Sequence, residues 1–111
     1  MTVTIFLHDE FKRQFRRLHK KYHSLANDLK DFQNELESNP FQGDDLGGGV
    51  RKIRMAISSK GRGKSAGARV LTLNILVRDN AEITLLTIYD KNEIDNVSDE
   101  YIKWLVAEAG K

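Results

Sequence analysis

The sequence predicts a single α+β domain with the element order βααβββα, and three observations support this prediction. Apolar residues recur with a helical period between residues 11 and 36. Apolar or alternating runs at 50–57, 68–77 and 82–89 are typical of strands. The 111 residues leave room for one hydrophobic core. We therefore expect an N-terminal helical hairpin packed on an antiparallel sheet, with a short C-terminal helix.

The first predicted strand spans residues 2–7, where apolar and other side chains alternate. A helical stripe follows, in which eight apolar residues are separated alternately by four and three positions. These residues are Phe11, Phe15, Leu18, Tyr22, Leu25, Leu29, Phe32 and Leu36. One continuous helix would be about 45 Å long, which is too long for a domain of this size to cover. We expect two helices at 9–22 and 24–38 instead, with Asp9 and Ser24 as their N-caps.

The second half of the chain reads as a meander followed by a helix. Residues 40–49 are expected to form a loop after Asn39-Pro40 ends the second helix. The three predicted strands then follow, joined by a flexible basic loop at 58–67 and a tight turn at 78–81. Ser98 is the expected N-cap of the C-terminal helix.

Composition excludes several classes of protein. The chain has no cysteine, so disulfide scaffolds, thiol catalysis and thiolate metal sites are excluded. No apolar run is long enough to span a membrane, and we expect a cytoplasmic protein. His8, His19 and His23 do not have the spacing of a metal site, and no cofactor is expected.

The net charge of +2 conceals a basic segment at residues 50–78, which holds eight basic residues and no acidic one. A polyanionic partner and a solvated basic face both remain open as explanations. Gly63-Lys64-Ser65 is similar to the end of a phosphate-binding loop, but Ser58 replaces its first glycine and a strand follows. We expect glycine here to let basic side chains approach a phosphate backbone.

Five candidate catalytic or binding side chains lie at predicted strand ends. Lys52 and Arg54 share one strand face, Arg69 begins the next strand, and Tyr89 and Lys91 stand at the end of the last. An antiparallel meander brings these places to one end of the sheet. Arginine is suited to bind phosphoryl oxygens, and lysine or tyrosine with a lowered pKa can move a proton, so the set suits RNA cleavage by 2′-hydroxyl attack. The expected RNA-binding residues are Arg51, Lys52, Lys60, Arg62 and Lys64.

Three sequence blocks, at 48–54, 63–70 and 85–93, resemble the RelE/HigB group of the RelE/ParE toxin superfamily. They read Gly-Gly-Val-Arg-Lys-Ile-Arg, Gly-Lys-Ser-Ala-Gly-Ala-Arg-Val and Leu-Leu-Thr-Ile-Tyr-Asp-Lys-Asn-Glu. The resemblance implies a RelE/ParE-like toxin domain over residues 1–111, from a bacterial type II toxin–antitoxin module. It also implies cleavage of mRNA in the ribosomal A site and silencing by a cognate antitoxin.

By position, the resemblance places Arg54, Arg69, Lys91 and Tyr89 in the catalytic set and Lys52 beside them. The chain departs from the family pattern where relatives carry aromatic residues after the Arg-Val step, since residues 71–74 are Leu-Thr-Leu-Asn. Two alternatives stay open. One is a ParE-like inhibitor of DNA gyrase without enzymatic activity, and the other is an RNA-binding domain that has lost catalysis.

Overall fold

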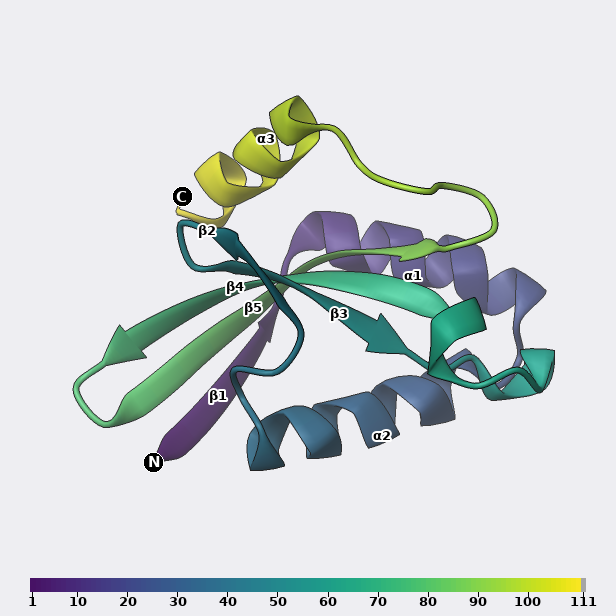
Figure 1. The fold of residues 1–111 in the computed structure, drawn as a ribbon, viewed down its shortest axis with the longest axis horizontal. Coiled ribbons are helices and arrows are strands. Elements are labelled where there is room, and N and C mark those ends of the chain that lie inside the picture. Colours follow the sequence, from purple (N-terminus) through teal and green to yellow (C-terminus); the bar gives the residue numbers. More distant parts are fainter. Residues whose placement is uncertain (111) are drawn as a thin grey trace.

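The computed structural model describes residues 1–110 and confirms the predicted α+β class, with its helical hairpin and its C-terminal helix (Figure 1). The helices are α1 (Asp9–Lys21), α2 (Leu25–Ser38) and α3 (Asp99–Ala109). The strands are β1 (Thr2–Leu7), β2 (Asp44–Gly47), β3 (Val50–Met55), β4 (Ala68–Val77) and β5 (Asn80–Asp90). Two short 3₁₀ turns, Ser58–Lys60 and Lys64–Ala66, shape the basic loop.

The five strands form one sheet in the order β1-β5-β4-β3-β2. Strands β2 to β5 pair antiparallel as expected, but β1 pairs parallel to β5, so the sheet is mixed and the expectation of a wholly antiparallel sheet is wrong. After β1 the helical hairpin crosses one face of the sheet. The meander follows, and its last strand, β5, pairs with β1. The apolar alternation within β1 predicts which face is buried, but it does not predict the neighbouring strand.

Strand β2 corrects the expectation that all of residues 40–49 form a loop. It pairs with β3 through Asp44 opposite Lys52 and Asp45 opposite Arg51. All four of its residues are exposed, so no buried side chains give it an alternating pattern. Backbone pairing and the side chain of Arg51, which reaches Asp45 and the carbonyls before the strand, form this edge strand. Its own residues therefore carry no alternating signal for it.

The helical stripe is core, as predicted. Five of its residues are buried and the other three are half-buried against the same cluster. The chain reverses between α1 and α2 at residues 22–24, which confirms the hairpin over one long helix. The cap of α1 differs from the prediction, because His8 Nδ1, rather than Asp9, accepts the Glu10 N–H at 2.9 Å. Ser24 precedes α2, but its hydroxyl donates to Asp28 and caps no helix N–H.

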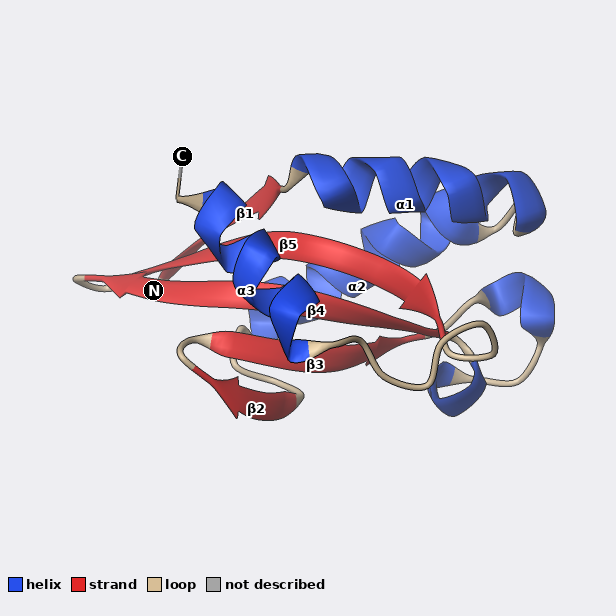
Figure 2. Cartoon of the chain, turned by 90° about the horizontal axis from the view of Figure 1, so that it is seen from above, coloured by secondary structure: helices blue, strands red, loops and turns tan. Residues whose placement is uncertain are grey.

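Helix α3 covers the opposite face of the sheet from α1 and α2. Leu105 packs there on Leu71, Leu86 and Tyr89. Figure 2 looks from this side, with α3 crossing in front of the strands and α2 behind them. Ser98 caps α3 as predicted, since its Oγ accepts the Tyr101 N–H at 3.1 Å. The sheet thus separates two apolar clusters, and the candidate site lies on the α3 side.

Candidate active site

Three of the predicted site residues form a row across neighbouring strands. Arg54 on β3 lies opposite Arg69 on β4, and Arg69 lies opposite Tyr89 on β5. Side chains directly opposite each other on a sheet face have Cβ atoms about 4.5–5.5 Å apart. Lys52 is two residues before Arg54 and shares its face. The structure therefore brings these four residues together at the end of the sheet where β3 and β5 finish.

Lys91 extends the row beyond the end of β5. Its backbone N–H donates to the carbonyl of Gly67 at 3.2 Å, which continues the β4–β5 pairing by one position. Its side chain is exposed and follows Tyr89 by two residues, so alternation places it on the same face.

Gly67 fixes how the basic loop enters β4. A Cβ at this position would lie 2.2 Å from the carbonyl oxygen of Met55 and 2.9 Å from the nitrogen of Ile57. Only glycine lets the loop pack this closely against the end of β3. The close approach sets the position of Arg69, two residues later.

The guanidinium of Arg69 holds the loop that precedes it. The residue is 8% exposed, and its Nη1 donates to the carbonyls of Lys64 at 3.3 Å and Ala68 at 3.2 Å. Its Nη2 donates to the Ser65 carbonyl at 3.0 Å. No carboxylate of the described residues forms an ion pair with it. Its charge therefore remains uncompensated next to Arg54, which also has no acidic partner in this part of the chain.

Tyr89 is 3% exposed, and its hydroxyl is a buried group without a hydrogen-bond partner among residues 1–110. Burial raises the pKa of this hydroxyl above its ordinary value, although the charge of Arg69 acts in the opposite direction. Tyr89 therefore keeps its proton at neutral pH. The lowered pKa that would make a tyrosine a general base is not found here.

Lys60 has a different position from the one that its place in a glycine-rich loop suggests. Its ammonium contacts Asp90 Oδ1 at 2.6 Å and the carbonyl of Ala66 at 2.9 Å. Burial alone would raise the pKa of Asp90, but hydrogen bonds from Lys60, Tyr22 and the Asn92 N–H outweigh it and lower that pKa. Lys60 is thus half of a buried ion pair that joins the basic loop to the end of β5.

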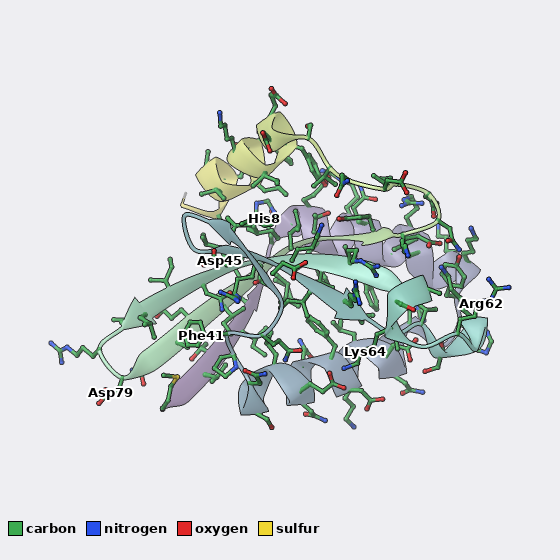
Figure 3. The ribbon with its side chains drawn as sticks, viewed as in Figure 1. His8, Phe41, Asp45, Arg62, Lys64 and Asp79 are labelled. Atoms are coloured by element: carbon green, nitrogen blue, oxygen red, sulfur yellow. The ribbon has the colours of Figure 1, made fainter. Side chains whose placement is uncertain are left out.

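The remaining predicted RNA-binding residues divide by their partners. Arg51 donates to the carbonyls of Gln42 and Gly43, both at 3.0 Å, and so holds the segment before β2. Lys64 pairs with Glu35 at 2.7 Å, with both side chains about half exposed. Arg62 is exposed and makes no ion pair with any residue that the structure describes. Figure 3 shows Arg62 at the end of the molecule away from Asp79 at the hairpin tip.

Sequence reasoning missed a buried polar network beside the row. The hydroxyl of Tyr101 donates to Glu10 at 2.5 Å and lies 2.9 Å from the hydroxyl of Thr87. Burial and the bond to Glu10 raise the pKa of Tyr101 to about 12. Burial would raise the pKa of Glu10, but bonds from Tyr101, Arg13 and Gln14 lower it. This network ties α3 to α1 and β5, and a separation of 91 positions leaves no local sequence signal for it.

The described residues contain no group of three or more histidine or acidic side chains arranged to hold a metal ion. None of the described helices has the length and apolarity needed to cross a bilayer. What the site does offer is a row of cations beside a tyrosine on a rigid sheet end, which is an arrangement suited to binding a phosphate group.

Comparison with protein families identifies the class of the chain. Residues 4–111 match the family described as the RelE toxin of the RelE / RelB toxin-antitoxin system. The match covers nearly the whole chain, so the chain belongs to the RelE toxin family. It is the toxin of a toxin–antitoxin module, and an antitoxin is its partner.

Proposed function

We propose that the chain is an endoribonuclease that cleaves mRNA on the ribosome. The observation that carries this proposal is the row of Arg54, Arg69 and Tyr89, in register on three strands with both cations free of carboxylate partners in the described chain. Cations without an internal carboxylate partner keep a positive field that attracts an external anion, and the exposed Arg54 is also free to contact it. Membership of the RelE toxin family and the resemblance to its HigB branch support mRNA as that anion.

The proposed reaction is an internal phosphoryl transfer. The 2′-oxygen of one nucleotide loses its proton and forms a bond to the adjacent phosphorus, while the bond from phosphorus to the 5′-oxygen breaks. The leaving 5′-oxygen takes up a proton. The products are a 2′,3′-cyclic phosphate and a 5′-hydroxyl end, and negative charge on the phosphoryl oxygens is greatest in the transition state.

We assign Arg54 to the phosphoryl oxygens, because it is exposed and rigidly held on β3. Arg69 is nearly buried and bonded to loop carbonyls, so its contribution is the positive field and the placement of the loop. Lys52 and Lys91 lie on either side of this pair. Either one can accept the 2′-hydroxyl proton after its own ammonium has released a proton to solvent.

Tyr89 is assigned the role of proton donor to the 5′-oxygen, because its raised pKa keeps it protonated. Its hydroxyl is covered in the free protein, so this role requires RNA binding to uncover the hydroxyl. Arg62 is the loop cation that contacts the RNA backbone. Lys64 contacts it as well, by leaving its ion pair with Glu35 and binding a phosphate. Lys60 and Arg51 are left out, because their side chains are committed to internal partners.

Translation of a defined mRNA in a cell-free extract, with the 5′ ends of the fragments mapped, tests this proposal. We expect new ends within codons only where ribosomes translate the message, and none on the same RNA without ribosomes. Arg54→Ala should produce far fewer of these ends while it keeps ribosome binding. Loss of DNA supercoiling without mRNA cleavage would support the ParE-like alternative instead.

One observation favours a second candidate, an RNA-binding domain without catalysis. The guanidinium of Arg69 is already bonded to three carbonyls and the Tyr89 hydroxyl is covered. Under this alternative the wild-type chain binds ribosomes with an affinity that falls as the salt concentration rises, but it yields no new 5′ ends at any concentration.

A further inference from the structure

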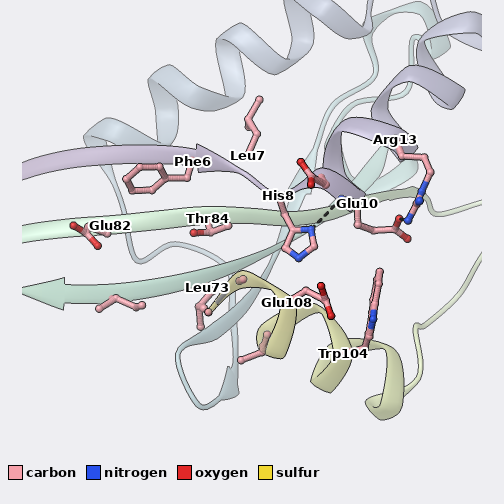
Figure 4. A pocket seen from close by; sticks show the side chains of 15 residues that line it. Phe6, Leu7, His8, Glu10, Arg13, Leu73, Glu82, Thr84, Trp104 and Glu108 are labelled. Carbon is pink, nitrogen blue, oxygen red and sulfur yellow. Dashed lines mark hydrogen bonds and ion pairs between the residues drawn. The ribbon is translucent and has the colours of Figure 1, made fainter.

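A second surface lies on the α3 side of the sheet, over its β1–β5–β4 part. It is a groove of about 650 Å³, bounded by α3 on one side and the start of α1 on the other (Figure 4). We call it the α3 groove. It is lined by Phe6–Glu10, Arg13, Leu73, Ile75, Glu82, Thr84, Trp104, Val106 and Glu108–Gly110. None of the proposed catalytic residues is among them.

The α3 groove contains large apolar side chains that are exposed to solvent. Phe6 and Ile75 are each 48% exposed and Trp104 is 43% exposed. They come from β1, β4 and α3, so they meet only in the folded protein. Large apolar side chains exposed along one groove, with polar residues between and around them, are typical of an interaction surface.

His8 adds a polar group that lacks a partner. Its Nδ1 accepts the Glu10 N–H at 2.9 Å, so the proton of the neutral ring lies on Nε2. Nε2 is buried and has no hydrogen-bond partner among residues 1–110. Figure 4 shows the ring facing into the groove between the strands and α3. A buried donor that is left unpaired can take an acceptor, such as a backbone carbonyl, from a bound chain once the side chains that cover it move aside.

The charge around the groove selects the kind of chain. Asp9 and Glu82 are carboxylates of its lining, and its one arginine, Arg13, is bonded to Glu10. This surface is therefore acidic on a chain whose net charge is +2. Phosphate backbones are repelled here, and an apolar segment that carries lysine or arginine is attracted.

We propose that the α3 groove holds a short amphipathic segment of the antitoxin, with large apolar side chains toward Phe6, Ile75 and Trp104 and basic side chains toward Glu82. Such a segment buries the exposed apolar side chains and gives the His8 N–H an acceptor. The proposal rests on membership of the toxin family and not on the nuclease activity. It makes the antitoxin contact separate from the cation row.

The test uses a matched pair of substitutions on β4. Ile75→Lys places a charge in the groove, directly opposite Glu82 on β5. Leu76→Lys is the control, because Leu76 is 59% exposed but lies on the other face of the same strand. The probes are the purified antitoxin encoded in the same module and overlapping peptides that span it. Binding is measured by calorimetry, and a thermal melt confirms that each variant is folded.

We expect Ile75→Lys to weaken binding by about 30-fold or more and Leu76→Lys to change it by less than about threefold. The peptide that binds wild-type protein should combine apolar residues with at least one lysine or arginine. Glu82→Gln should weaken the binding of this peptide and reduce the salt dependence of that binding. If Ile75→Lys does not fold, Trp104→Ser replaces it, and we expect the same loss of antitoxin binding.

Three results would overturn the proposal. The first is equal binding by the Ile75→Lys and Leu76→Lys variants. The second is a wild-type dimer that Ile75→Lys dissociates, which would make the groove a contact between two copies of the chain. The third is loss of ribosome binding by Ile75→Lys with antitoxin binding intact. None of these outcomes depends on whether the chain cleaves RNA.

Discussion

Replacement of Lys60 by methionine should destabilise the protein without weakening its contact with RNA. Lys60 pairs with Asp90 at 2.6 Å, the Lys60 side chain is 9% exposed, and Asp90 is fully buried. Removal of one partner from a buried ion pair costs about 3–5 kcal/mol. Asp90 keeps its bonds from Tyr22 and the Asn92 N–H, so we expect the low end, about 3 kcal/mol. For a domain of this size that corresponds to a fall in Tm of roughly 10–20 °C.

Arg62→Ala is the matched control from the same loop. Arg62 is exposed and makes no ion pair within the described chain, so its loss should change stability by no more than about 0.5 kcal/mol. It should instead reduce the slope of log affinity for ribosomes against log salt by about one unit. Lys60→Met, measured below its unfolding temperature, should leave that slope unchanged.

Urea unfolding and ribosome binding at several salt concentrations supply both quantities for both variants. The assignment of Lys60 to the fold is refuted if Lys60→Met has the same free energy of unfolding in urea as the wild-type protein. It is also refuted if Lys60→Met lowers the salt slope as much as Arg62→Ala does. The first outcome would show that the ion pair does not stabilise the fold, and the second that the ammonium of Lys60 leaves Asp90 to bind phosphate.

Three further predictions concern the packing and the buried polar groups. Gly67→Ala should cost at least about 1–3 kcal/mol in urea unfolding, because its Cβ would lie 2.2 Å from the Met55 carbonyl oxygen. The raised pKa of Tyr101, about 12, means that its neutral form stabilises the fold. That contribution is complete below pH 10 and lost as the pH rises toward 12, and Tm measured against pH should lose this alkaline limb in Tyr101→Phe. The lowered pKa of Asp90 means that its stabilisation is present above its ordinary pKa of 3.8 and lost as the pH falls below it, so Asp90→Asn should flatten the acid limb.

The parts of the fold that could be predicted are those in which the residue pattern of one segment shows which of its faces is buried. The stripe from Phe11 to Leu36 has the helical period because each member faces the same core. The meander follows from strand alternation and turn residues, and it brings Arg54, Arg69 and Tyr89 to one sheet end.

The parts that could not be predicted depend on partners that are distant in the sequence. The parallel pairing of β1 with β5 and the exposed strand β2 leave no pattern in their own residues. Lys60 looks like any loop cation until the fold places Asp90 beside it. The bond between Tyr101 and Glu10, and the groove that exposes Ile75, likewise exist only after the sheet has formed.

Single-turnover cleavage on programmed ribosomes, at saturating toxin, tests the proposed role of the cation row most directly. Arg54→Ala should lower the saturated rate by about 10²–10³-fold, because it removes a donor to the phosphoryl oxygens. Arg62→Ala should reach nearly the wild-type rate once saturated, and the fragments should carry 2′,3′-cyclic phosphate and 5′-hydroxyl ends. A saturated rate that falls more for Arg62→Ala than for Arg54→Ala would contradict the assignment, and an absence of cleavage by wild-type protein would contradict the nuclease itself.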